Sequence, residues 1–264
     1  MNPDWLIPDW PAPPHVKAVF TSRAGGVSVA PFDSFNLGDH VADNPTDVAT
    51  NRQILQSAIA AQPVFLQQVH GTDVALLTSQ TPHGTVADAC LTMQQKLACT
   101  IMVADCLPVL FTDVEGRFVA AAHAGWRGLA DGVLRQNIAS INAIASVNIE
   151  YEAIKIIAWL GPCIGSNAFE VGSEVKAAFA ASLPDSAQFF KSTGNPESGK
   201  WLADLAGLAR LQLGQLGLGE AQIFGNDSSM DWCTVNNPLR YFSHRRDAVR
   251  LGSSGRMAAC IWIE

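Results

Sequence analysis

The 264-residue sequence contains no apolar run that approaches the roughly 20 residues of a membrane-spanning helix. Positive charge is scarce as well. The chain has 17 Lys and Arg against 24 Asp and Glu, and a formal net charge of -7 does not favour binding to nucleic acid. The N-terminus has no basic segment followed by an apolar one, so no signal peptide is expected. We therefore expect a cytoplasmic protein that binds neither nucleic acid nor membranes.

Cysteine is too sparse for a disulfide framework. The six cysteines have no close, regular spacing, so we expect reduced thiols, with Cys90, Cys99 and Cys163 in structural positions. The sequence also lacks internal repeats, long linkers and blocks of like charge, while 48% of its residues are hydrophobic, enough for a sizeable core. These features predict one domain over residues 1–264, with the Pro- and Trp-rich residues 1–14 as an extended arm. We expect a monomer or a small homo-oligomer.

A β-hairpin is predicted over residues 103–128. Two largely apolar runs, 107–111 and 117–122, flank a short turn segment, 113–116. That segment begins with Asp and ends with Gly116, the residue types of a tight turn. The hairpin brings two reactive side chains, a thiol and an imidazole, toward each other from its two strands.

The register of this hairpin decides how close those side chains come. If Val114 and Glu115 are the central turn residues, Cys106 faces His123 with the Cα atoms roughly 4.5–5.5 Å apart. A bulge at Gly116 would move the register by one residue and still leave the two side chains near each other. A Cys and a His can also meet by chance in a core, since free Cys is among the most buried residue types.

The segment after His123 has the features of an anion site. Glycines at both ends of residues 125–128 allow a ligand to approach the backbone, and a helical pattern over 129–146 follows. A helix N-terminus offers free N–H groups, and Arg127 adds a guanidinium fork. A solvated arginine on an ordinary strand-to-helix connection is the alternative.

The periodicity and turn signals predict an α+β fold, a single domain of mixed β-sheets flanked by helices. Strands and helices mix without strict alternation, and one hairpin is present, which argues against a doubly wound parallel sheet. The expected strands are 16–21, 64–69, 97–103, 153–160 and 257–263, the expected helices are 46–61, 129–146, 169–181 and 202–216, and 189–199 is expected to be a mobile loop.

Seven motifs in order give the sequence a resemblance to a known family. It resembles the YfiH-like laccase-domain family, first described as multicopper polyphenol oxidases and now as purine nucleoside phosphorylases with adenosine deaminase activity. The motifs are TSRAGGVS (21–28), FNLGDH (35–40), QQVHG (67–71), VADC (103–106), HAGWRG (123–128), GPCIG with FEVG (161–172) and FSHRRD (242–247).

The resemblance implies a YfiH-like fold, which is related to cysteine hydrolases, and it adds His70 to the suspected site. It also makes Asn36 and His40 candidate substrate-binding residues, because the NLG-x-H pattern falls there. The implied activity is phosphorolysis of adenosine, inosine or methylthioadenosine, with deamination of adenosine. Nucleoside and phosphate are then the expected small-molecule partners.

Two imidazoles and one thiolate form a sound donor set for zinc. His70, Cys106 and His123 would leave a fourth position open, as in catalytic zinc sites, and their spacing matches no zinc finger. Zinc-bound water can ionise at a pKa of about 7, and the resulting hydroxide could attack the amino-bearing carbon of a purine. These three residues are therefore the expected metal ligands and catalytic residues.

Phosphorolysis also requires a phosphate site. The cationic and polar candidates come from three motifs, and the sequence does not choose among them. They are Arg23, Arg127, His244 and Arg245, with the neighbouring Arg246 in the same basic cluster.

Two rival chemistries use the same residues. Cys106 could be a nucleophile activated by His123, as in cysteine hydrolases. Alternatively, two His and one Cys form the trigonal set of electron-transfer copper, with Met102 or Met93 as a weak axial ligand. Laccase chemistry needs several coppers with imidazole ligands, however, and the chain has six histidines. Zinc is thus expected ahead of copper.

Overall fold

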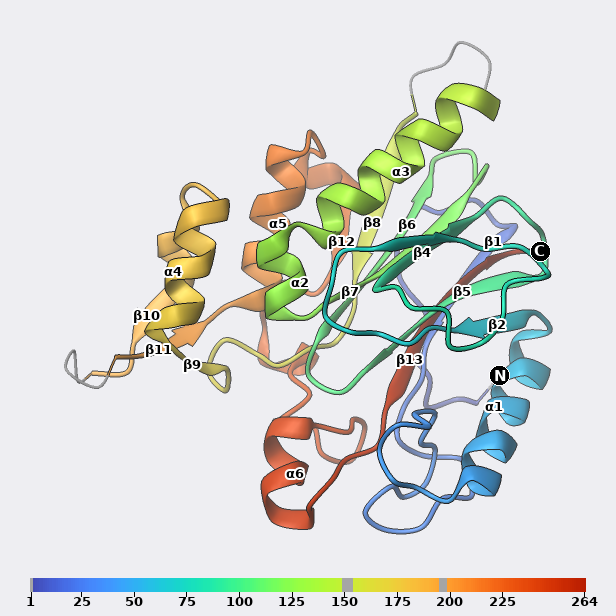
Figure 1. Ribbon diagram of the computed structural model, residues 1–264, viewed down its shortest axis with the longest axis horizontal. Helices are drawn as coiled ribbons and strands as arrows, with labels where there is room; N and C mark the ends of the chain where they lie inside the picture. The colour runs from blue at the N-terminus through green and yellow to red at the C-terminus, as the bar shows by residue number, and fades with distance from the viewer. Residues whose placement is uncertain (1, 149–153, 195–198) are drawn as a thin grey trace.

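The computed structural model describes residues 2–148, 154–194 and 199–264. These residues form an α+β fold of mixed β-sheets flanked by helices, so the predicted fold class is confirmed. Figure 1 shows α2, α3 and α5 above and to the left of the two larger sheets, and α1 below and to the right. The helices are α1 (Pro45–Ile59), α2 (Trp126–Asp131), α3 (Val133–Asn148), α4 (Ser173–Ser182), α5 (Leu205–Gln215) and α6 (His244–Leu251), with short 3-10 turns at Ser186–Phe189, Glu220–Gln222 and Met230–Trp232.

The largest sheet has six strands in the order β12-β8-β6-β7-β4-β3. Its outer pairs, β12–β8 and β3–β4, are parallel, and its three inner pairs are antiparallel. The strands are β3 (Val74–Leu76), β4 (Ala89–Thr92), β6 (Leu107–Asp113), β7 (Val119–Ala124), β8 (Ile156–Leu160) and β12 (Ile223–Gly225).

Two further sheets complete the fold. A four-stranded sheet has the order β1-β13-β5-β2, and a three-stranded antiparallel sheet has the order β10-β11-β9. Their strands are β1 (Val16–Phe20), β2 (Gln62–Phe65), β5 (Leu97–Val103), β13 (Met257–Ile263), β9 (Glu170–Gly172), β10 (Phe190–Ser192) and β11 (Lys200–Ala203). The predicted strands 97–103 and 257–263 are confirmed.

The two large sheets face each other, and helices cover both outer faces. One apolar cluster, which includes Ile101 and Leu110, lies between the sheets. A second, with Phe111 and Leu134, joins the six-stranded sheet to helices, and a third, with Leu55, lies under α1. Because successive strand residues point to opposite faces, both faces of β6 are buried, and its sequence is apolar without alternation.

The hairpin of β6 and β7 forms as predicted, but its register differs by two residues. Pro108 faces His123, and Cys106 continues the register opposite Gly125. The loop is longer than a two-residue turn because Asp113 organises it: its carbonyl accepts the N–H of Gly116 at 3.0 Å, and its carboxylate accepts the N–H of Arg117 at 2.8 Å. A two-residue shift keeps the facing of every side chain, so the thiol and the imidazole still meet.

Three predicted helices have different bounds. The single helix expected at 129–146 is two, because Gly132 takes a left-handed conformation (φ 98°) and ends α2 before α3 begins. The helices expected at 169–181 and 202–216 each begin with strand residues, since β9 and β11 pair with each other before α4 and α5 start. Asp204 caps α5 by accepting the N–H of Gly207.

Strand and loop predictions also need correction. The strand expected at 64–69 is β2 and ends at Phe65, because the Gln68 side chain pairs with the N–H and C=O of Met102 in place of a backbone partner. Part of the loop expected at 189–199 forms β10, while 195–198 lie outside the described residues. The strand expected at 153–160 begins at Ile156, and residue 153 also lies outside them.

Both ends of α1 follow local chemistry close to that predicted. Asn44 caps the helix by accepting the N–H of Thr46 at 2.9 Å, and Pro45 occupies the first turn. The helix stops at Ile59, before the predicted residue 61, because Ala60 takes a left-handed conformation. None of the helices in the described ranges has the length and apolar character needed to cross a membrane.

Candidate metal and catalytic site

Three side chains converge where the two large sheets meet. His70 follows β2, Cys106 lies between β5 and β6, and His123 belongs to β7. Their donor atoms all lie within 4.8 Å of one another, and Cys106 Sγ is 3.7 Å from His70 Nε2. The structure therefore brings together the three residues that the sequence predicts as metal ligands.

Asp88 supports two of these residues and was missed as a site residue. Its carboxylate lies 2.8 Å from His123 Nδ1 and accepts the backbone N–H groups of Val69, His70 and Gly71 at 2.7–3.0 Å. These bonds hold His70 at φ 61°, a left-handed conformation that is uncommon for a residue with a side chain. Since Nδ1 of His123 faces Asp88, its Nε2 is left for the cluster.

Gly125 leaves room for the cluster. A Cβ at this position would lie 2.8 Å from His70 Cδ2 and 3.1 Å from Cys106 Sγ, so any side chain would collide with two expected ligands. The helix after it, α2, begins at Trp126 and has six residues. The space before this helix is thus occupied by His70 and Cys106.

The charges in the cluster favour an ionised thiol. Burial raises the pKa of Cys106, but the charge of His123 and hydrogen bonds from both imidazoles outweigh it and lower that pKa to about 6. Burial lowers the pKa of His123, yet Cys106 and Asp88 together raise it to about 9. Burial also opposes ionisation of Asp88, and its hydrogen bonds nevertheless lower its pKa. A thiolate and an imidazolium therefore pair at neutral pH.

Asp105 links the cluster to the C-terminal part of the chain. It is buried, has φ 87°, and its carboxylate accepts the hydroxyl of Thr234 at 2.5 Å and the N–H of Arg245 at 2.6 Å. Its carbonyl accepts the N–H of Ile164 at 2.9 Å. These bonds fix the connection that carries Cys106 against the start of α6.

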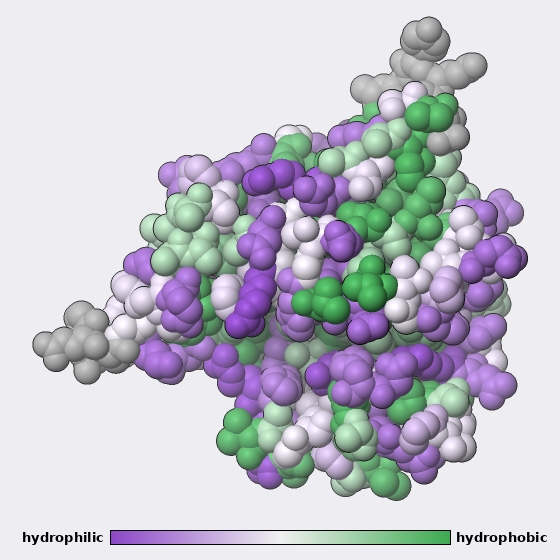
Figure 2. All heavy atoms as spheres, viewed as in Figure 1, coloured by the Kyte–Doolittle hydropathy of each residue, from purple (hydrophilic) through white to green (hydrophobic). Residues whose placement is uncertain are grey.

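His70, Cys106 and His123 line a cavity of about 430 Å³. This volume is within the range of small-molecule sites. The first turns of α2 and α6 contribute residues to the cavity, and Figure 2 shows a mixture of hydrophilic and hydrophobic residues on the surface between the positions of these two helices. The lining residues are His40, Gln68, His70, Met102, Val103, Ala104, Asp105, Cys106, His123, Trp126, Arg127, Ile164, Phe169, His244, Arg245 and Arg256.

Four of the six predicted substrate-binding residues line this cavity. Arg127 is exposed and stacks on Trp126, with its guanidinium carbon 4.3 Å from the ring centroid. Arg245 donates to the carbonyls of Ala168 and Glu170 at 3.3 and 3.0 Å. His40 and His244 complete the four, and both are exposed.

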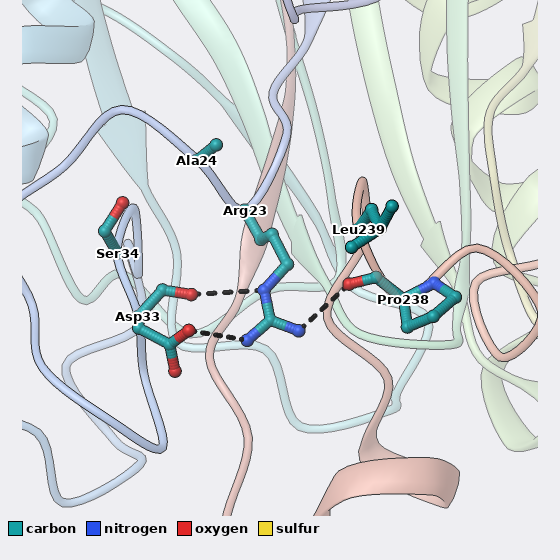
Figure 3. A pocket seen from close by; sticks show the side chains of 6 residues that line it. All are labelled: Arg23, Ala24, Asp33, Ser34, Pro238 and Leu239. Atoms are coloured by element: carbon teal, nitrogen blue, oxygen red, sulfur yellow. Dashed lines mark hydrogen bonds and ion pairs between the residues drawn. The ribbon is translucent and has the colours of Figure 1, made fainter.

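The other two predicted residues lie elsewhere. Arg23 lines a separate pocket, where it donates to the carbonyl and carboxylate of Asp33 and to the carbonyl of Pro238 (Figure 3). Asn36 is fully buried and binds Gly38 and Asp43. Both side chains form hydrogen bonds between loop residues, and neither lines the cavity that contains His70, Cys106 and His123.

Several lining residues were missed by sequence reasoning. Trp126 and Phe169 provide aromatic surface, and Arg256 provides a third arginine. Trp126 lies inside the HAGWRG motif, whose glycines and arginine carry the prediction of an anion site. Arg256 directly precedes a predicted strand, and no local signal distinguishes it from a solvated residue.

All six cysteines are free thiols, as expected. Cys163 is buried, and burial raises its pKa well above the ordinary value, so its expected structural position is consistent with the structure. Cys90 and Cys99 are completely buried in the core. Cys106 is the partly exposed member of the six.

The donor set fits zinc. Bonds of 2.0–2.3 Å in a tetrahedron place ligand atoms about 3.3–3.8 Å apart. The distance of 3.7 Å between Cys106 Sγ and His70 Nε2 satisfies this, and the full donor set, within 4.8 Å, would tighten around the ion. An ionised thiol and a histidine whose other nitrogen faces a carboxylate are typical of zinc sites. Within the described residues, this is the one group of three or more His, Cys, Asp or Glu side chains with such geometry.

The fold and the donor set together define a class: an α+β protein with an open His₂Cys site in a small-molecule cavity. Over residues 17–264 the sequence matches the family model described as multi-copper polyphenol oxidoreductase laccase. The chain therefore belongs to this family.

Similar proteins cover nearly the whole chain. The sequence is 44% identical over 260 residues to purine nucleoside phosphorylase YfiH of Escherichia coli strain K12, and 43% identical over 260 residues to purine nucleoside phosphorylase PA4543 of Pseudomonas aeruginosa, with 98% of each chain covered in both cases. Among solved structures, protein NMB0706 of Neisseria meningitidis superposes with a TM-score of 0.85 at 43% identity over 99% of both chains. YfiH of Bacillus licheniformis gives a TM-score of 0.82 at 29% identity over 94% of this chain and 93% of its own.

Proposed function

We propose that this protein is a zinc-dependent purine nucleoside phosphorylase with adenosine deaminase activity. The observation that carries the proposal is the convergence of His70, Cys106 and His123 in a cavity with aromatic and cationic walls. The relatives named purine nucleoside phosphorylase support the choice of reaction. The substrates would be adenosine, inosine or methylthioadenosine with phosphate.

The cavity offers a surface for each part of the substrates. Trp126 and Phe169 can stack on a purine. Arginines 127, 245 and 256 provide forks that match phosphate oxygens. This combination of flat apolar and cationic surfaces favours a nucleoside and a phosphate over two apolar ligands.

The three ligands would hold the metal, and the surrounding residues prepare them. Zinc, when bound, supplies a Lewis acid and a water of lowered pKa, the reagent that deamination needs. Asp88 fixes the tautomer of His123, and its three backbone hydrogen bonds fix His70. Gly125 keeps the space between them free of a side chain.

A metal-free hydrolase is the second candidate, and one observation favours it. Cys106, His123 and Asp88 have the relationship of a Cys–His–Asp triad: a thiol with a pKa of about 6 beside an imidazole that a carboxylate orients. Such a thiolate could attack an amide or ester carbonyl. His70 has no role in this chemistry, whereas it completes a three-ligand metal site.

A copper-dependent polyphenol oxidase is third. Met102 lines the cavity and could serve as an axial copper ligand. Laccase chemistry needs several coppers, and the described part of the chain holds one suitable cluster. The ligand count therefore favours a single metal ion.

The test combines product analysis with metal analysis. Purified protein of measured zinc and copper content is incubated with adenosine or inosine, with and without phosphate. We expect adenine or hypoxanthine with ribose 1-phosphate when phosphate is present, and inosine with ammonia from adenosine. A chelator should abolish both activities, and zinc should restore them. Full activity in verified metal-free protein would reject the zinc proposal.

A single substitution separates the metal site from the triad. His70→Ala removes one ligand but leaves Cys106, His123 and Asp88 intact. The zinc proposal expects loss of bound zinc and of activity, and the triad expects retention. His83→Ala, a loop histidine outside the cavity, is the matched control and should keep wild-type zinc content.

A further inference from the structure

Arg256 is a cavity residue whose backbone is held by the NLG segment. Its N–H donates to Asn36 Oδ1 at 2.8 Å, and its carbonyl accepts the N–H of Leu37 at 3.0 Å. Asn36, a predicted substrate-binding residue, does not line the cavity. It acts on the cavity by holding the backbone of Arg256 in position.

The same segment leaves room for that side chain. A Cβ on Gly38 would lie 2.7 Å from Arg256 Cγ and 3.4 Å from His40 Cε1. Both Arg256 and His40 line the cavity, and the charge of Arg256 contributes, after burial, to the lowered pKa of His40. Residues 36–40 thus bring the Arg256 and His40 side chains near each other in the lining of the cavity.

The charge of Arg256 has no direct counterion within the described residues. Its Nη1 donates to the carbonyls of Ser254 and Gly255 at 2.8 and 3.2 Å, and no acceptor among those residues is recorded for Nε or Nη2. The side chain is half-buried, and burial lowers its pKa, with the charges of Cys106 and Asp105 opposing that shift. A half-buried guanidinium with three free N–H donors, one on Nε and two on Nη2, is stabilised when an anion binds it.

Nearby carboxylates are already paired with other groups. Asp39 forms an ion pair with Arg52 at 3.2 Å and lies 3.6 Å from Nδ1 of His40. Asp105 accepts the hydroxyl of Thr234 and the N–H of Arg245. Neither carboxylate forms an ion pair with Arg256 in the described structure, so the free donors of Arg256 are available to a ligand.

The other two cavity arginines are less suited to bind phosphate. Both terminal nitrogens of Arg245 already donate hydrogen bonds, Nη1 to the carbonyl of Ala168 and Nη2 to that of Glu170. Arg127 is exposed and lies flat on Trp126, where water competes for its donors. Burial makes a charge-assisted hydrogen bond stronger, and this favours Arg256.

We infer that Arg256, with His40 beside it, forms the oxyanion subsite of the cavity and binds inorganic phosphate. The inference rests on the proposed phosphorolysis for its role in a reaction. There the bound phosphate oxygen would form a bond to C1′ of the ribose, while the C1′–N bond breaks and its electron pair leaves with the purine, which takes up a proton. No further reagent is consumed.

Phosphate binding can be measured without any nucleoside. Zinc-analysed protein is titrated with inorganic phosphate in an isothermal titration calorimeter, for wild type and for Arg256→Met. Loss of a charge-assisted bidentate contact should weaken binding about 10- to 100-fold. Arg256→Lys keeps the charge but loses the fork, and it should give an intermediate affinity.

One control and one second test variant distinguish a loss of phosphate binding from a loss of folding. Arg135→Met removes an exposed arginine of α3 and should behave as wild type. Gly38→Ala keeps Arg256 but displaces its side chain, so it should weaken phosphate binding while zinc content stays at the wild-type level. Circular dichroism and thermal unfolding verify that each variant is folded.

The outcomes distinguish this inference from the proposed function. If phosphorolysis occurs but folded Arg256→Met and Gly38→Ala keep the wild-type phosphate affinity and the wild-type KM for phosphate, the subsite is wrong. If phosphate binds in an Arg256-dependent way but no phosphorolysis is found, the proposed function fails and the oxyanion subsite stands. If wild type binds no phosphate at up to 10 mM, about tenfold above a KM at the upper end of the usual range, the inference is rejected.

Discussion

Substitution of Asp88 by Asn should weaken both zinc binding and the stability of the folded protein. The carboxylate serves four N–H donors, two at each oxygen: His70 and His123 at Oδ1, and Val69 and Gly71 at Oδ2. Asn has one acceptor oxygen, so either orientation leaves two donors without an acceptor. At about 1–3 kcal/mol for each unsatisfied donor, the free energy of unfolding should fall by about 2–6 kcal/mol.

The effect on zinc depends on the same geometry. If the amide nitrogen faces His123, it donates to Nδ1 and moves the ring proton to Nε2, the atom that should bind the metal. Loss of such an outer hydrogen-bond partner typically weakens metal binding about 10- to 100-fold. Asp88→Asn should therefore lower both zinc affinity and thermal stability, even though the residue touches no metal.

The assay is a zinc competition titration with a chromophoric chelator, with thermal unfolding measured in parallel on metal-free protein. Asp73→Asn is the matched control, because it removes an exposed carboxylate from the loop after His70 and should leave both quantities unchanged. A Tm decrease of roughly 5–20 °C is expected for Asp88→Asn. Wild-type zinc affinity and a wild-type Tm would show that the carboxylate does not organise the ligands.

Two further predictions address the thiol and the backbone. In metal-free protein, alkylation of Cys106 by iodoacetamide should rise with a midpoint near pH 6, because the thiolate is stabilised there, and zinc should protect it. A midpoint near pH 8.5, the value of an ordinary thiol, would refute the pairing with His123. Gly132→Ala should destabilise the protein by about 1 kcal/mol or more, since φ is 98°. Gly214 occupies an exposed position of α5 with room for a Cβ, so Gly214→Ala should stabilise the protein by up to about 1 kcal/mol in urea unfolding. Equal effects of the two glycine substitutions would contradict this explanation of the break between α2 and α3.

Local chemistry predicted the parts of the fold that depend on neighbours in sequence. The Asn44 cap, the closing strand β13 and the existence of the β6–β7 hairpin are of this kind. The hairpin register was not predictable, because the carboxylate of Asp113 lengthens the loop by binding the N–H of Arg117. Turn type depends on such side-chain bonds, and the four turn residues alone fit more than one type.

Some residues of the candidate site could also be predicted from the sequence, and others could not. Residues with intrinsic reactivity, such as Cys106 and His123, stand out in the sequence. Asp88 and Arg256 do not, because each acts through backbone segments far away in the chain. A charged residue in the apolar stretch 87–92 was a usable signal for Asp88, since a buried carboxylate requires several donors. For Arg256 no comparable signal exists.

The positions of the three ligands have a consequence for the mechanical behaviour of the protein. His70 extends from the four-stranded sheet, His123 belongs to the six-stranded sheet, and Cys106 lies on the short connection that passes from one to the other. An ion bound by all three residues would cross-link the four-stranded sheet to the six-stranded sheet. Separation of the sheets and release of the ion would then be a single event, and the site could form only after both sheets have docked.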